Sequence, residues 1–251
     1  MFAFDDFMIC DQDYLSNLLI SIFYFGCLIG FFIIPTVADN FGRKIGMLIS
    51  WGIFGVGVLV LAFSFHPGLI GIGEFLAGFG SNPAIILCYS FINEQFLRKS
   101  RQIYGVGIQV FFAVGMCITG LLFIPDLTWR YVLYLLLGLI LVSFISLFYL
   151  LETPKFLMIR EKEKTLEVLN TMARRNKKDE ITIDDIKDIS VESKEDGASA
   201  LDLCRYKSLR SKTIVSGITL FGILAIYYST LLNLENAGFD KLINLLIVGA
   251  S

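Results

Sequence analysis

Long stretches of this 251-residue chain lack charge altogether. Residues 15–37 and 45–65 contain no Asp, Glu, Lys or Arg. Each run reaches the ~20 residues that an α-helix needs to cross a bilayer. Apolar residues make up 55% of the chain, above the ~45–50% that is usual for soluble proteins. These features exclude an ordinary soluble domain and predict an all-α membrane protein.

The residues that several other functions require are also scarce. The only histidine is His66, and the only acid within a predicted span is Glu74, so the cluster expected of an intramembrane enzyme is missing. No G-x-x-x-x-G-K-[ST] loop is present, which disfavours ATP-driven pumping. The net charge of −2 gives no reason to expect a nucleic-acid partner. We therefore expect no enzymatic activity, no cofactor and no metal site.

Hydropathy predicts six complete transmembrane helices, roughly at residues 15–37, 45–65, 68–92, 103–124, 131–151 and 213–232. A further apolar run starts at Leu242 and stops at Ser251, too early to cross a bilayer. The prediction is six complete spans plus the start of another, as in a fragment of a longer protein. The first span contains Gly26-x-x-x-Gly30, which predicts close helix packing.

Lysine and arginine placement predicts the orientation. The turns at residues 39–44 and 93–102, together with segment 152–212, hold 19 of the 21 basic residues. Positive charge gathers on the cytoplasmic side of membrane proteins. These segments are therefore predicted to be cytoplasmic. The start of the chain is acidic where a secretory signal would be basic, and it is predicted to lie on the opposite side.

A short charged turn, Ala38-Asp39-Asn40-Phe41-Gly42-Arg43-Lys44, separates the first two spans. Gly42 permits a sharp turn. Asp39 is predicted just beyond the end of its helix, where the helix dipole disfavours an anion, so a cationic partner is expected. The pattern Asp-x-x-Gly-Arg-Lys resembles the signature loop of the major facilitator superfamily of transporters, which helps to latch the cytoplasmic gate. An ordinary positive-inside loop is the competing interpretation.

Two further motifs strengthen this resemblance. Glu94 and Arg101 resemble the Glu-x6-Arg motif of sugar porters and organic ion transporters. Glu152, Pro154 and Lys155 resemble the Pro-Glu-Ser-Pro-Arg-Trp-Leu motif that follows the sixth helix in the same branch. Lysine keeps the charge of the usual arginine but not its bidentate geometry. All three motifs occur in the expected order, and an amphipathic cytoplasmic helix is predicted after the third.

Four residues are candidates for the substrate site. Glu74 and Gln109 are polar groups at lipid depth, where each requires a partner or a water-filled cavity. Tyr227 and Tyr228 lie midway along the last complete span, where organic ion transporters place a tyrosine in the substrate cavity. A tyrosine ring face can hold a cation or an aromatic ring. The competing interpretations are snorkelling or pairing with a neighbour for Glu74, an interhelical structural bond for Gln109, and helix packing for the two tyrosines.

The resemblance implies a partial major facilitator fold in three parts. Residues 1–151 form the N-terminal transmembrane bundle, equivalent to family helices 2–6. Residues 152–212 form a cytoplasmic linker with the amphipathic helix, and residues 213–251 begin the C-terminal bundle. The first helix and most of the C-terminal half are missing from this equivalence.

The implied function is secondary-active or facilitative transport of small organic solutes by alternating access in the plasma membrane. Organic ions are the first expectation, and sugars are the alternative. A non-transporting membrane subunit is the competing hypothesis. The lipid bilayer and the missing helices of a parent transporter are the other expected partners.

Overall fold

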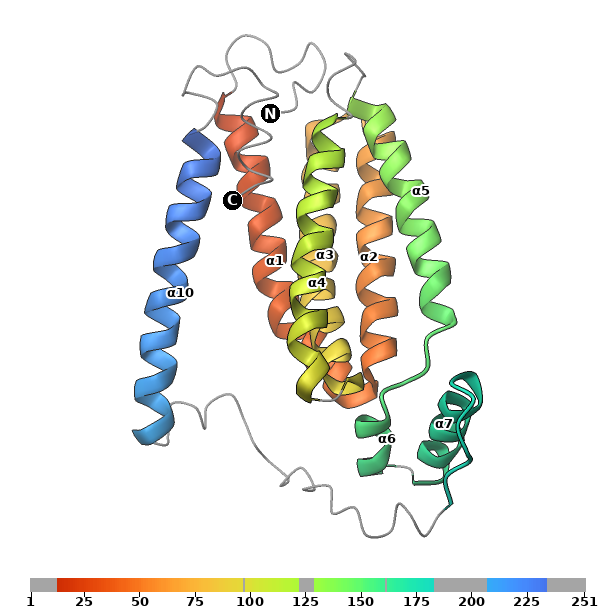
Figure 1. Cartoon of the computed structure of the whole chain (residues 1–251). Coiled ribbons are helices and arrows are strands. Elements are labelled where there is room, and N and C mark those ends of the chain that lie inside the picture. The colour runs from red at the N-terminus through yellow and green to blue at the C-terminus, as the bar shows by residue number, and fades with distance from the viewer. Residues whose placement is uncertain (1–12, 97, 122–128, 161, 183–206, 234–251) are drawn as a thin grey trace. The chain divides into compact units, whose positions relative to one another are not determined.

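The computed structural model describes residues 13–96, 98–121, 129–160, 162–182 and 207–233, and the regular structure in these ranges is entirely α-helical. The helices are α1 (Asp13–Phe41), α2 (Arg43–Phe63), α3 (Pro67–Gln95), α4 (Arg98–Leu121), α5 (Trp129–Phe148), α6 (Pro154–Arg160), α7 (Lys162–Arg175) and α10 (Lys207–Asn233) (Figure 1). The chain divides into two units. The first contains residues 1–108 and 126–185, and the second contains residues 109–125 and 186–251.

A helix occupies each of the six predicted span positions. Within the described residues, four of them are long and apolar enough to cross a membrane: Asn17–Phe41, Arg43–Phe63, Pro67–Gln95 and Trp129–Phe148. The fourth and sixth predicted spans fall on α4 and α10, where some side chains lie outside the described set. Helix α10 begins at Lys207 rather than at residue 213. The run at residues 242–251 lies outside the described part of the chain.

Small residues bring α1, α2 and α3 into backbone contact in the first unit. A methyl group added at Gly26 would strike the backbone of Phe75, and one added at Gly78 would strike the backbone of Phe23. The close packing that Gly26-x-x-x-Gly30 predicts is therefore confirmed. Between α2 and α3, the Ser50 hydroxyl donates a 2.7 Å hydrogen bond to the carbonyl of Gly80. Such packing replaces the hydrophobic effect, which supplies no attraction between helices in lipid.

Side chains fill the remaining space in two clusters. One cluster gathers near the charged turn and consists of Ile34, Ala38, Met47, Leu87, Phe91 and Leu147. The other consists of Leu19, Leu61, Ile70 and Ala77. Helix α5 packs on α2, where Ile140 lies beside Gly55 and the Phe63 and Tyr134 rings are 5.9 Å apart. These contacts make α1, α2, α3 and α5 one packed bundle.

The predicted amphipathic helix is present as α7. Thr165 and Ala173 are buried, whereas Arg174 and Arg175 are exposed. The chain then folds back along α7. Its return is fixed by the Asn170 amide, which accepts from the Ile181 N–H at 2.8 Å and donates to the Ile181 carbonyl at 3.2 Å. The segment after α5 is thus a small packed unit at one end of the bundle.

Candidate functional site

Helix α1 is followed directly by a glycine that other residues cannot easily replace. The helix continues to Phe41, and the chain turns at Gly42, whose φ is 118°. That left-handed φ is accessible to glycine without steric cost. Asp39 therefore lies inside the last turn of α1, and the sequence-based end at Val37 was wrong. The helix persists because the Gly42 N–H still reaches the Ala38 carbonyl, at 3.0 Å.

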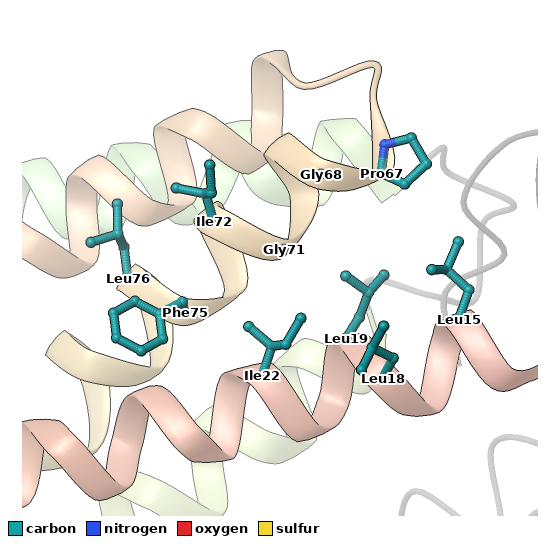
Figure 2. A pocket seen from close by; sticks show the side chains of 10 residues that line it. All are labelled: Leu15, Leu18, Leu19, Ile22, Pro67, Gly68, Gly71, Ile72, Phe75 and Leu76. Carbon is teal, nitrogen blue, oxygen red and sulfur yellow. The ribbon is translucent and has the colours of Figure 1, made fainter.

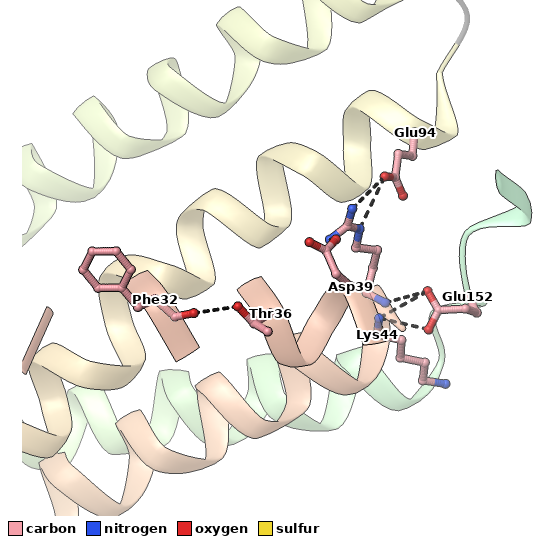
Figure 3. A network of polar contacts seen from close by, with 7 residues as sticks. Phe32, Thr36, Asp39, Lys44, Glu94 and Glu152 are labelled. Atoms are coloured by element: carbon pink, nitrogen blue, oxygen red, sulfur yellow. Dashed lines mark hydrogen bonds and ion pairs between the residues drawn. The ribbon is translucent and has the colours of Figure 1, made fainter. Parts of the chain in front are cut away.

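Arg43 joins three helices at this corner. Its guanidinium contacts Asp39 of α1 at 2.5 Å and Glu94 in the last turn of α3 at 3.2 Å. Asp39 faces the negative end of the α1 dipole, so the guanidinium offsets an unfavourable interaction. The side chains of Arg43 and Glu94 are only 18% and 14% exposed. Figure 3 shows Asp39 and Glu94 converging here from α1 and α3.

Glu152 approaches the same corner from the segment before α6 (Figure 3). Its carboxylate accepts the backbone N–H of Arg43 at 3.1 Å and that of Lys44 at 3.1 and 3.3 Å. It also accepts the N–H of Thr153 at 3.0 Å. The first amides of a helix have no partner within the helix and carry a partial positive charge. Glu152 therefore caps α2 from more than a hundred residues away.

Two further cations bind helix ends at this corner. The Lys44 ammonium donates to the Phe148 carbonyl at 2.9 Å, at the end of α5. The Arg160 guanidinium donates to the Asn40 carbonyl, in the last turn of α1. Cations are favoured near helix C-termini, where carbonyls lack partners. Sequence reasoning did not single out Arg160, and no motif at that position identifies it.

The remaining motif residues lie at the same end of the bundle but outside this network. Arg101 lies in the first turn of α4, is exposed, and forms no ion pair within the described residues. Pro154 is the first residue of α6, a position where its missing N–H costs no hydrogen bond. Lys155 is exposed. One oxygen of Glu94, Oε2, is buried without a hydrogen-bond partner among the described residues.

The candidate substrate residues are distributed over both units. Glu74 of α3 is half-buried in the first unit and has no hydrogen bond or ion pair with any residue that the structure describes. Gln109 of α4 is exposed and belongs to the second unit. Tyr227 and Tyr228 lie on α10, also in the second unit, and their side chains fall outside the described set. Their grouping around one substrate stays a prediction.

An apolar groove of about 470 Å³ lies between the start of α1 and the start of α3 (Figure 2). Its walls are hydrocarbon side chains and glycine backbone: Leu15, Leu18, Leu19, Ile22, Pro67, Gly68, Gly71, Ile72, Phe75 and Leu76. A charged solute finds no partner there. Within the described residues, no group of three or more His, Cys, Asp or Glu side chains is arranged to hold a metal ion.

Known transporters resemble this chain along nearly its whole length. It is 30% identical to solute carrier family 22 member 3 of Mus musculus over 96% of this chain and 44% of that protein. It is 27% identical to the organic cation transporter protein of Drosophila melanogaster over 97% of this chain and 46% of that protein. The chain thus spans less than half the length of these curated relatives.

The fold has a counterpart among solved structures. The xylose transporter XylE from E. coli, in a partially occluded inward-open conformation, matches 94% of this chain and 59% of its own with a TM-score of 0.64 at 17% identity. The model of the sugar (and other) transporter family matches residues 9–250. On this evidence, the chain is a multi-pass membrane protein that belongs to the sugar (and other) transporter family of the major facilitator superfamily.

Proposed function

We propose that this chain takes part in alternating-access transport of small organic ions across the plasma membrane, with the corner around Arg43 as part of the cytoplasmic gate. The observation that carries the proposal is the bridging position of Arg43 between Asp39 and Glu94. A single guanidinium that links α1, α2 and α3 lets these helices move as one body. Rocking of rigid bundles about a central site is the mechanism of such transporters.

Two groups at this corner, Glu94 Oε2 and the Arg101 guanidinium, lack a partner within the described residues. They support a second arrangement of the ion pairs. Glu94 Oε2 is buried with no partner among the described residues, and Arg101 is exposed without an ion pair. A buried acceptor without a donor costs about 1–3 kcal/mol. Pairing of Glu94 with Arg101 in another gate state removes that cost. The corner is therefore proposed to exchange partners as the gate opens and closes.

An organic cation is the proposed substrate class. Glu74 supplies a negative charge that has no partner within the described residues, and Gln109, Tyr227 and Tyr228 supply polar and aromatic groups. Intramembrane acids commonly mark substrate or proton pathways. One relative is named an organic cation transporter protein and another an organic cation transporter-like protein, which supports this choice, whereas a third is named organic anion transporter 3. The xylose transporter and the family name support a sugar as the alternative.

Uptake into vesicles tests the proposal. The chain is reconstituted alone and together with the C-terminal half of a relative supplied as a second chain, because it spans less than half of the relatives. Saturable uptake of a quaternary ammonium ion is compared with that of an aromatic carboxylate and a hexose. We expect saturable uptake of the cation. The Glu74→Gln variant should take it up more weakly, and Tyr227→Ala and Gln109→Ala should each raise the KM for the cation.

Substitutions at the Arg43 corner test the gate part of the proposal separately from the substrate part. Arg43→Ala is expected to lower the uptake rate with little change in the amount of protein in the membrane, and Lys212→Ala, at an exposed lysine outside the motifs, is its control. Preference for the hexose favours the sugar alternative. Lack of uptake in every arm, with the chain correctly inserted, favours a non-transporting subunit and overturns the proposal.

A further inference from the structure

We propose that the basic turn after α7, residues 174–178, binds the headgroups of anionic phospholipids in the cytoplasmic leaflet. The turn contains Arg174, Arg175, Lys177 and Lys178 in five consecutive residues. The gate described above does not use any of them. The inference is independent of the transported substrate and concerns how the segment after α5 is held against the membrane.

The turn has a fixed geometry. The Lys178 N–H donates to the Ala173 carbonyl at 2.9 Å, and the Lys177 N–H donates to the Arg174 carbonyl at 3.2 Å. This pair of bonds is the Schellman arrangement that closes helix C-termini. Lys177 holds its left-handed position with a φ of 54°. Glycine is the usual residue there, so the lysine adopts this φ at a conformational cost.

Most of the positive charge is available to a ligand. Arg174 pairs with Glu180 at 2.8 Å, and the side chains are 71% and 57% exposed. Arg175, Lys177 and Lys178 are exposed and form no ion pair within the described residues. Asp179 is the other acid beside the turn. Three cations and one acid, Asp179, are therefore without an ion pair within the described residues, which leaves the turn with a net charge of +2 (3 − 1) for an external anion.

The fold places the C-terminal end of α7, where these cations lie, level with the ends of the neighbouring helices. Figure 1 shows α7 rising from the level of α6, so that its C-terminal end lies level with the ends of α1 and α2. That end of the bundle is the one where Arg43 and Glu152 meet. The clamp between Asn170 and Ile181 holds the returning chain against α7. The turn thus lies at the end of α7 that is level with the ends of α1 and α2 in this view (Figure 1).

The chemistry of the membrane surface selects the ligand. Basic residues next to membrane spans are attracted to anionic lipids, and this attraction falls off within a Debye length of ~8 Å. Arginine and lysine donate hydrogen bonds to phosphate and carboxylate oxygens. Phosphatidylserine carries both groups, whereas phosphatidylcholine is neutral. The two lipids therefore differ in the charge that the turn would recognise.

Lipid binding by the full chain tests this site. The chain is purified in detergent and titrated with tail-labelled phosphatidylserine or phosphatidylcholine, and binding is followed by fluorescence anisotropy. The test variant is Arg175→Gln/Lys177→Gln/Lys178→Gln. The control variant, Lys155→Gln/Lys162→Gln/Lys164→Gln, removes equal charge from α6 and the start of α7. Thermal unfolding checks that both variants remain folded.

We expect the full chain to prefer phosphatidylserine, and the test variant to bind it at least about tenfold more weakly. The control variant is expected to bind like the parent, and the preference is expected to weaken at high salt. Equal affinity for the two lipids overturns the proposal, as does unchanged binding by the test variant.

Discussion

Glu152 holds the backbone amide of Lys44 between its two carboxylate oxygens, at 3.1 and 3.3 Å. The bond ties the start of α2 to the segment that follows α5. Glycine at position 42 makes the approach feasible, because a methyl group there would collide with the Glu152 carboxylate. A capping acid and a turn glycine far apart in sequence thus form one structural element.

Removal of the cap is the first prediction. Glu152→Ala leaves the amides of Arg43 and Lys44 without their acceptor, so the chain is expected to lose about 1–2 kcal/mol of stability. Glu152→Gln keeps an oxygen acceptor but loses the charge, and a smaller loss is expected. Thermal unfolding in detergent measures both. Lys155→Ala, on an exposed side chain, is the control and should unfold like the parent.

The second prediction concerns the turn itself. Gly42→Ala is expected to cost about 1–3 kcal/mol, because it combines an unfavourable left-handed φ with a clash against Glu152. Gly42→Ala combined with Glu152→Ala removes the clash and retains the conformational strain. The double variant should therefore unfold at a higher temperature than the sum of the single effects predicts. Strict additivity would show that the clash is absent in solution.

A double-mutant cycle tests the ion pair between Arg43 and Glu94. Arg43→Ala leaves a half-buried carboxylate unpaired, so it should destabilise more than Arg43→Ala does in a Glu94→Gln background. We expect a coupling energy of about 0.5–3 kcal/mol from the four melting curves. A coupling energy near zero would mean that solvent screens the pair, as it does for ordinary surface ion pairs.

Matched glycines test the packing of α2 on α3. A Cβ at Gly80 would meet the backbone of Ser50 and Phe54, whereas a Cβ at Gly107 meets no described residue within 4 Å. Gly80→Ala is expected to lower the melting temperature by several degrees, at about 2–4 °C per kcal/mol. Gly107→Ala should be neutral or stabilising by up to ~1 kcal/mol, since alanine favours helix. Equal effects would refute the close contact.

Lys177→Gly separates conformational strain from charge at the turn after α7. Glycine adopts the observed φ of 54° freely, so this substitution should stabilise the cap by up to about 1 kcal/mol. Lys177→Gln removes the same charge but keeps the strain, and it should leave stability unchanged. Amide hydrogen exchange at Lys178 and in the last turn of α7 reports the difference. Faster exchange in the glycine variant would contradict the strain argument.

Helix positions and the turn at Gly42 were predictable because both depend on local sequence. Long apolar runs identified the four helices that, within the described residues, are able to cross a membrane, and Gly42 identified the turn. The capping role of Glu152 was not predictable in the same way. A carboxylate that accepts hydrogen bonds from backbone amides leaves no pattern in the residues around those amides, since every residue except proline provides an N–H.

Two other features show where local patterns stop being informative. The end of α1 was placed at Val37 because the apolar run stops there, yet hydrogen bonding carries the helix to Phe41 through polar residues. The bond from Arg160 to the Asn40 carbonyl depends on how α6 is placed beside α1. Local sequence indicates which residues are helical. It does not indicate which helix ends come into contact, because that depends on how the helices pack.

The long separation between Lys44 and Glu152 has a consequence for biosynthesis. The capping carboxylate is 108 residues downstream of the amide that it receives. At ~5–20 residues per second, the ribosome needs on the order of 5–20 s to reach it. During that interval, the first N–H groups of α2 must donate their hydrogen bonds to water or lipid headgroups instead. Glu152 then completes a corner that began to form four helices earlier, before α2, α3, α4 and α5 were made.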